Sequence, residues 1–232
     1  MIPLRDDAPR LTTPFITYFL IVLNTVIFLF EVMLAPGART EFVYQFGVVP
    51  ESFVDAFSGS RGSSIAGAGV SLFSSMFLHG GWLHLIANMW ALWIFGDNIE
   101  DHLGHFRYLA LYFASGVAAA LLHIAFNQDS SVPTVGASGA IAGVMGAYFL
   151  LFPSARVLTI MPVVFVFVWL PAWIVLGYWF VAEFLSGAAD SIVRTSKTGG
   201  GVAFWAHVGG FIAGVTLIKL FPAAHPRYQF RD

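Results

Sequence analysis

The sequence predicts an all-α membrane protein whose chain crosses the bilayer six times. Of its 232 residues, 58% are hydrophobic and only 10% are charged. The mean hydropathy is +0.78. A soluble domain would have about a quarter of its residues charged. Long stretches also lack Lys, Arg, Asp and Glu altogether, as expected for helices that face lipid.

Each predicted span is an apolar stretch of about 16 to 20 residues, enough to cross the hydrocarbon core as a helix. The fourth is short, which suits a helix that begins below the membrane surface. The six-span domain covers 15–221, between a tail at 1–14 and a tail at 222–232. The predicted spans are 15–34, 82–101, 107–126, 137–152, 170–187 and 202–221.

The connections between the spans differ in composition. Residues 35–80 are rich in aromatic residues, so we expect this first loop to pack on or partly into the bilayer, with the Gly- and Ser-rich stretch 58–69 as its mobile segment. Residues 160–170 are apolar but short and bounded by prolines, which favours a membrane-surface or re-entrant connection. Residues 187–201 are polar, end in three glycines, and predict a mobile cap between the last two spans.

The basic residues predict the orientation. An even number of spans puts both termini on one side, and cytoplasmic loops are enriched in Lys and Arg. We therefore expect cytoplasmic termini. The 1–14 segment contains acidic residues and is broken by proline, unlike a signal peptide or a mitochondrial presequence, so a prokaryotic plasma membrane is the expected location. The side of the termini receives Arg5, Arg10, Arg107, Arg156, Lys219, Arg227 and Arg231, and the other side Arg39, Arg61, Arg194 and Lys197.

Composition also excludes several classes of function. The net charge of −2 gives no reason to expect a nucleic-acid partner. The chain has no cysteine, which excludes disulfides, thiolate metal sites and a cysteine nucleophile. No H-E-x-x-H zinc motif occurs, so a metalloprotease site of this kind is not expected.

Ser138 is the candidate nucleophile, at the start of the fourth span within Gly136-Ala137-Ser138-Gly139. Free backbone N–H groups at a helix N-terminus would stabilise an oxyanion, and Gly136 and Gly139 would let a substrate backbone approach closely. The alternative is packing: Gly139, Gly143 and Gly146 form a small-residue face that joins helices, and serine is a normal member of such faces.

His207, in the last span, is the candidate base. Gly210 and Gly214 follow it and would allow close contact with the fourth span, which would bring the imidazole toward Ser138. A purely structural histidine is the alternative. Glu183 is the nearest acidic candidate, but we expect it on the wrong face, and so predict a dyad without a carboxylate that orients the base.

His84 and Asn88 are four residues apart and project from one helix face, where both can donate hydrogen bonds to an oxyanion. A polar clasp between helices is the alternative. His79 is expected to point elsewhere and anchor the first loop. The acidic cluster Asp97, Glu100 and Asp101 is expected to be a solvated or arginine-paired helix end. In the predicted topology Ser138, His84 and His207 all lie toward the outer leaflet.

These motifs, in this order, resemble the rhomboid family of intramembrane serine proteases. The resemblance rests on His79-x4-His84-x3-Asn88, on the GASGAIAG sequence around Ser138, and on Ala206-His207-x2-Gly210-x3-Gly214. It implies a rhomboid bundle, a Ser138–His207 dyad, and an oxyanion hole formed by His84, Asn88 and the Ser138 N–H. It also implies cleavage of single-span membrane proteins within the bilayer, without a cofactor.

Two positions depart from the family pattern. Many relatives have an aromatic residue four after the nucleophile, packed on the catalytic imidazole, where this chain has Ala142. Many also carry a Trp-Arg pair in the first loop, where this chain has Val70-Ser71. Two rival functions remain open: a catalytically silent rhomboid-like scaffold that binds membrane clients, and a transporter or haem protein in which His84 and His207 ligate iron. The sequence does not indicate an oligomeric state.

Overall fold

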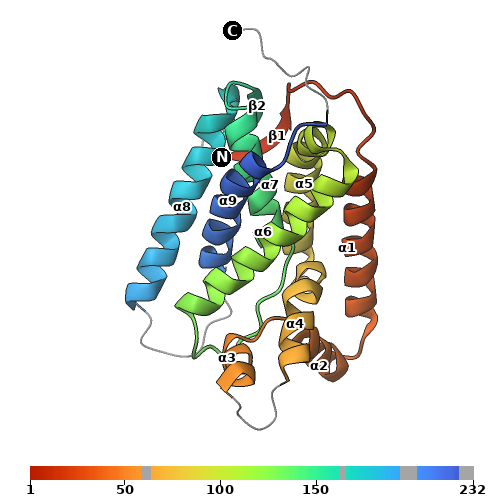
Figure 1. Cartoon of the computed structure of the whole chain (residues 1–232), viewed down its shortest axis with the longest axis vertical. Coiled ribbons are helices and arrows are strands. Elements are labelled where there is room, and N and C mark those ends of the chain that lie inside the picture. Colours follow the sequence, from red (N-terminus) through yellow and green to blue (C-terminus); the bar gives the residue numbers. More distant parts are fainter. Residues whose placement is uncertain (59–63, 162–165, 194–202, 225–232) are drawn as a thin grey trace.

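The computed structural model describes residues 1–58, 64–161, 166–193 and 203–224, which form a helical bundle with a small sheet at one end (Figure 1). A helix lies at each of the six predicted spans, and the mostly helical membrane fold is confirmed. These helices are α1 (Phe15–Met33), α5 (Trp82–Leu103), α6 (His105–Phe126), α7 (Ser138–Leu151), α8 (Ala172–Val193) and α9 (Phe204–Leu217).

The helices differ in their capacity to cross a membrane. Within the described ranges, α1, α6 and α8 are each long and apolar enough to do so. The helix α5 joins them if it is counted with the preceding α4, from which it is bent by 81°. The helices α7 and α9 are apolar but shorter. The chain is therefore an integral multi-pass membrane protein.

The first loop is helical rather than irregular. It contains α2 (Pro36–Phe46), α3 (Pro50–Ser58), α4 (Ile65–Ser74) and the 3-10 turn η1 (Ser75–Phe77). The stretch 58–69 was expected to be its mobile segment, but Ser58 ends α3 and 65–69 form the first turns of α4. Residues 59–63 of that stretch, and 194–201 of the expected cap, lie outside the described residues.

An all-α fold was predicted, and the structure corrects this with a three-stranded antiparallel sheet, β1-β2-β3. Its strands are β1 (Ile2–Asp6), β2 (Arg156–Met161) and β3 (Val166–Pro171). The segment expected to be a membrane-surface or re-entrant connection is thus mostly a pair of β-strands. Its β-branched residues favour extended backbone, and Val157 and Thr159 alternate as fully buried residues on one face.

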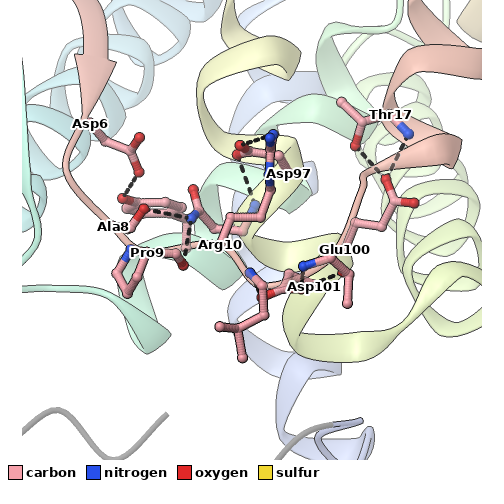
Figure 2. A network of polar contacts seen from close by, with 12 residues as sticks. Asp6, Ala8, Pro9, Arg10, Thr17, Asp97, Glu100 and Asp101 are labelled. Carbon is pink, nitrogen blue, oxygen red and sulfur yellow. Dashed lines mark hydrogen bonds and ion pairs between the residues drawn. The ribbon is translucent and has the colours of Figure 1, made fainter. Parts of the chain in front are cut away.

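The N-terminal tail is fastened to the C-terminal end of α5 by the acidic cluster (Figure 2). Glu100 accepts hydrogen bonds from Ile16 N at 2.8 Å and from both Thr17 N and Thr17 Oγ1 at 2.7 Å. These backbone donors belong to the first turn of α1, which lacks a side-chain cap of its own. Glu100 therefore acts as the N-terminal cap of α1, supplied from another helix.

Asp101, the next residue of α5, binds the tail in a similar way. It accepts hydrogen bonds from Leu11 N at 3.1 Å and Thr12 N at 2.7 Å, and the Thr12 hydroxyl also donates to it. The solvated helix end expected from the sequence is wrong for Glu100 and Asp101, because each is only 1% exposed. Asp97 does pair with an arginine, Arg10, at 3.1 Å.

The strand β1 is tied to the bundle by Asp6, which accepts a hydrogen bond from the Tyr148 hydroxyl of α7 (Figure 2). Burial, together with the nearby Asp97 carboxylate, raises the pKa of Asp6 from 3.8 to about 6, although the bond from Tyr148 opposes that rise. The folded protein therefore favours the protonated carboxyl of Asp6 over the carboxylate. Its contribution to stability is complete below about pH 4 and is lost as the pH rises through 6.

We expect Asp6→Asn to stabilise the protein at pH 7.5, because asparagine remains uncharged and can still accept the Tyr148 bond. The midpoint of thermal unfolding should rise by about 2–4 °C, the shift that ~1 kcal/mol produces in a chain of this size. The gain should vanish at pH 4.5, where Asp6 of the native protein is protonated. A pH-independent difference between the two proteins would contradict this account.

Candidate functional site

The helices α7 and α9 touch through their glycines, as the sequence predicted. A Cβ added at Gly210 would lie 1.9 Å from Gly139 O, and one at Gly214 would lie 1.8 Å from Gly143 O. No side chain other than hydrogen fits at these crossing points. Gly143 follows Gly139 by four residues, and its partner Gly214 follows Gly210 by four residues as well. The two helices therefore run parallel, and their N-terminal ends lie at the same level of the bundle.

This contact places the two candidate catalytic residues at one end. Ser138 is the first residue of α7, one residue before the crossing at Gly139, and His207 lies in the first turn of α9, one turn before Gly210. Nearly the whole of α7 is buried between its neighbours, from Gly139 to Tyr148. Within the described segments of the chain, no hydrogen bond joins the Ser138 and His207 side chains.

His84 lies beside Ser138, on the other side of Gly136. The point where a Gly136 Cβ would sit is 2.7 Å from His84 Nε2 and 3.5 Å from Ser138 Oγ. Gly136 has a φ of +130°, which side-chain-bearing residues rarely adopt. The glycine is therefore required twice, for its backbone angle and to let the imidazole of His84 approach Ser138. The imidazole of His84 is also close enough to that of His207 for electrostatic interaction.

Asn88 lies one turn further along α5 and is 7% exposed. Its buried side-chain nitrogen Nδ2 has no hydrogen-bond partner among the described residues. An unpaired buried donor costs about 1–3 kcal/mol, so the Nδ2 group favours any acceptor that reaches it.

His79 anchors the first loop, as expected. Its backbone N–H donates to the fully buried Glu31 of α1 at 3.1 Å, and Arg39 donates to its carbonyl oxygen at 3.4 Å. Its ring, however, does not point away from the site: it packs edge-on against His84, with 5.2 Å between ring centroids. The His79 ring therefore packs against the His84 ring.

The expectation that Glu183 lies on the wrong face is wrong. Its carboxylate Oε2 is 2.7 Å from His207 Nδ1, and both side chains are largely buried, at 16% and 12% exposure. The prediction that no carboxylate orients His207 is therefore also wrong. Hydropathy predicted that Glu183 lies in a helix. It did not predict how that helix is rotated about its axis, and this rotation decides which residue Glu183 faces.

The side chain that packs on His207 is also visible. Ala142 of α7 is too small for this role, and the indole ring of Trp179 in α8 lies 5.7 Å from the imidazole, tilted by 35°. The aromatic residue thus comes from a different helix than in the family pattern. Trp179 and Glu183 are one turn apart on α8, so the same face of this helix contacts both the imidazole ring of His207 and its Nδ1 atom.

A small cavity of about 30 Å³ adjoins Ser138, with room for one or two water molecules. It is lined by Gly136, Gly139, Thr134 and His123 among others, and His123 Nε2 lies 3.0 Å from the Thr134 hydroxyl. His123 had not been recognised from the sequence, where it is a lone polar residue near the end of an apolar stretch.

The sequence profile of the Rhomboid domain matches residues 66–223. The match covers more than half of the chain and includes every residue of the site. The chain belongs to the rhomboid family. Within the segments of this rhomboid that the structure describes, no cluster of three or more His, Cys, Asp or Glu side chains could hold a metal ion.

Curated relatives of this rhomboid come from several kingdoms. Rhomboid protein 1, mitochondrial, of Saccharomyces cerevisiae is 34% identical over 150 residues, which are 63% of this chain and 40% of that protein. Rhomboid protease GluP of Bacillus subtilis is 31% identical over 143 residues, 62% of this chain and 26% of that protein. RHOMBOID-like protein 5 of Arabidopsis thaliana is 42% identical over 76 residues, 33% of this chain and 25% of that protein. The aligned region is less than half the length of each of these relatives.

Proposed function

We propose that this rhomboid is an intramembrane serine endopeptidase that cleaves transmembrane segments of single-span membrane proteins. The observation that carries the proposal is the parallel glycine contact between α7 and α9, because it brings Ser138 and His207 to one end of the bundle. A relative from Bacillus subtilis is named a rhomboid protease. The catalytic dyad of the proposal is Ser138 as nucleophile and His207 as base.

Glu183 contacts Nδ1 of His207, so the proposed reaction uses the other ring nitrogen, Nε2. His207 Nε2 takes the Ser138 hydroxyl proton as Oγ attacks the scissile carbonyl carbon. The protonated imidazole then gives that proton to the leaving amine, and the acyl-enzyme forms. A water molecule activated by His207 hydrolyses the ester and restores the serine.

The negative charge of the tetrahedral intermediate falls on the former carbonyl oxygen. The Ser138 N–H at the N-terminus of α7, the His84 imidazole and the unpaired Asn88 amide are the donors proposed for it. Gly136 and Gly139 leave the substrate backbone room to approach. Loss of one such donor typically lowers the rate by about 10²–10³.

Six spans with cytoplasmic termini are proposed for the topology. Residues 2–14 and 218–224 both lie toward the end of the bundle at which α5 ends, together with five basic residues. The helices α5, α7 and α9 begin toward the opposite end of the bundle (Figure 1). The site then lies toward the non-cytoplasmic leaflet. The relatives carry mitochondrial as well as bacterial names, so the comparisons favour no particular membrane. The basic residues are Arg5, Arg10, Arg107, Arg156 and Lys219.

A fluorophosphonate probe tests the nucleophile without knowledge of the substrate. We expect the purified protein in detergent to be labelled on a single peptide at Ser138, and labelling to be lost in His207→Ala, because the hydroxyl needs its base. Mass spectrometry of the labelled protein locates the adduct. An inserted, folded protein that takes up no probe at Ser138 would favour the catalytically silent scaffold instead.

A further inference from the structure

We propose that Glu183 and Trp179 are positioning residues of the catalytic base, so that the site works as a Ser138–His207–Glu183 triad. This inference rests on the proposed protease function. Both residues are on α8, one helical turn apart, and both face His207 of α9. Glu183 holds the Nδ1 edge of the imidazole at 2.7 Å, and Trp179 covers its face at 5.7 Å between ring centroids.

The carboxylate of Glu183 has His207 as its one hydrogen-bonding or ionic partner within the described residues. A carboxylate in an apolar helix costs several kcal/mol unless it is paired, so its position needs a partner of this kind. The helix that carries it, α8, is one of the three in the described part of the chain that are long and apolar enough to cross a membrane. The pair is therefore shielded from solvent on most sides, where electrostatic attraction is stronger than in water.

The chemical consequence is the tautomer of His207. A neutral imidazole carries one proton, and a carboxylate can only accept a hydrogen bond. The proton is therefore fixed on Nδ1, and Nε2 keeps the lone pair that must receive the Ser138 proton. When the imidazole becomes charged during the attack, the adjacent carboxylate stabilises it.

Trp179 supplies the second restraint. A neutral imidazole held by one hydrogen bond can still rotate about that bond, and Ala142 offers no surface to stop it. The indole ring of Trp179 blocks rotation of the imidazole on one side. The α7–α9 glycine contact keeps the backbone of His207 at a fixed distance from Ser138.

Glu183→Gln tests the carboxylate with almost no change in shape. We expect kcat for a transmembrane reporter to fall by about 10²-fold or more, because a triad with the wrong tautomer loses up to about 10⁴-fold. KM should stay within about twofold, since the Glu183 carboxylate contacts Nδ1 of His207 and not the ring nitrogen proposed to react. The matched control is Glu41→Gln, an exposed glutamate of α2, which should leave both constants unchanged.

A second measurement does not depend on activity. In ¹⁵N-histidine-labelled protein, with His207→Gln to assign the signal, the spectrum of the neutral imidazole should report a protonated Nδ1 and a bare Nε2. In Glu183→Gln the population should shift toward the Nε2–H tautomer. A native protein with its proton on Nε2 would overturn the inference whether or not any variant folds.

The two proposals fail in different ways. If the native protein cleaves reporter and Glu183→Gln retains at least half of its kcat, the triad is wrong and the protease stands. If the native protein never cleaves and Ser138 takes no probe, the protease is wrong, and the tautomer measurement still decides whether Glu183 fixes His207. Trp179→Leu should lower kcat without changing the tautomer, whereas the neighbouring, exposed Tyr178→Phe should change neither.

Discussion

Replacement of Ser138 by alanine is expected to abolish cleavage of a transmembrane reporter while the protein remains folded. The alanine keeps the helix start and the glycine contacts of α7 but removes the attacking oxygen. We expect a loss of about 10⁶-fold in kcat, the size seen when a serine protease loses its nucleophile or its base. The measurement is reporter cleavage in vesicles at saturating substrate.

His207→Ala should lose as much, and the double variant should lose no more than either single one, because the two groups act in one step. The control is Ser131→Ala, at an exposed serine of the α6–α7 connection, which should cleave at the native rate. Full activity in correctly inserted Ser138→Ala protein would end the protease proposal.

Gly214→Ala is expected to destabilise the protein more than any other single methyl group discussed. The added Cβ would lie 1.8 Å from Gly143 O and 2.5 Å from Gly143 C, which are backbone atoms and cannot rotate away. The helices α7 and α9 must then separate. We expect a loss of about 3 kcal/mol, which lowers the unfolding midpoint by about 6–12 °C in a chain of this size.

The matched control is Gly69→Ala in α4, where an added Cβ meets nothing within 4 Å. Alanine is favoured over glycine in a helix by up to about 1 kcal/mol, so this variant should be neutral or more stable. The two substitutions are chemically identical, but only Gly214→Ala should lower the unfolding midpoint. A Gly214→Ala protein that melts at or above the native temperature would disprove the close contact.

The same separation should reduce catalysis. Because Gly214 lies two turns from His207 along α9, a shift of this helix moves the base relative to Ser138. Gly214→Ala protein assayed below its lowered unfolding temperature should therefore cleave more slowly than native protein, whereas Gly69→Ala should not.

Much of the helical portion of the fold followed from hydropathy. The predicted spans 15–34, 82–101 and 107–126 match α1, α5 and α6 to within a few residues, because a long apolar stretch satisfies its backbone polar groups in lipid as a helix. The segment 160–170 was interpreted less well. A short apolar run has no periodicity that separates a strand from a buried helical turn, and its pairing with β1 joins residues more than 150 positions apart.

The interactions of charged groups were also decided by distant contacts. Glu100 and Asp101 were expected at a solvated or arginine-paired helix end, because they cluster at the end of the second predicted span. In the structure both are buried, and backbone N–H groups of the first turn of α1 donate to Glu100 while those of the tail donate to Asp101. Nothing near Glu100 in the sequence marks the start of α1 as its partner.

The sequence by itself identified the residues that we propose for the chemistry: Ser138 at a helix start, His207 beside glycines, and His84 with Asn88 on one helix face. Only the tertiary structure decided how the imidazole of His207 is held. The periodicity of a helix gives the spacing of its residues but not its rotation against a neighbour. The rotation of α8 against α9, set by side-chain packing along both helices, turned Glu183 and Trp179 toward His207.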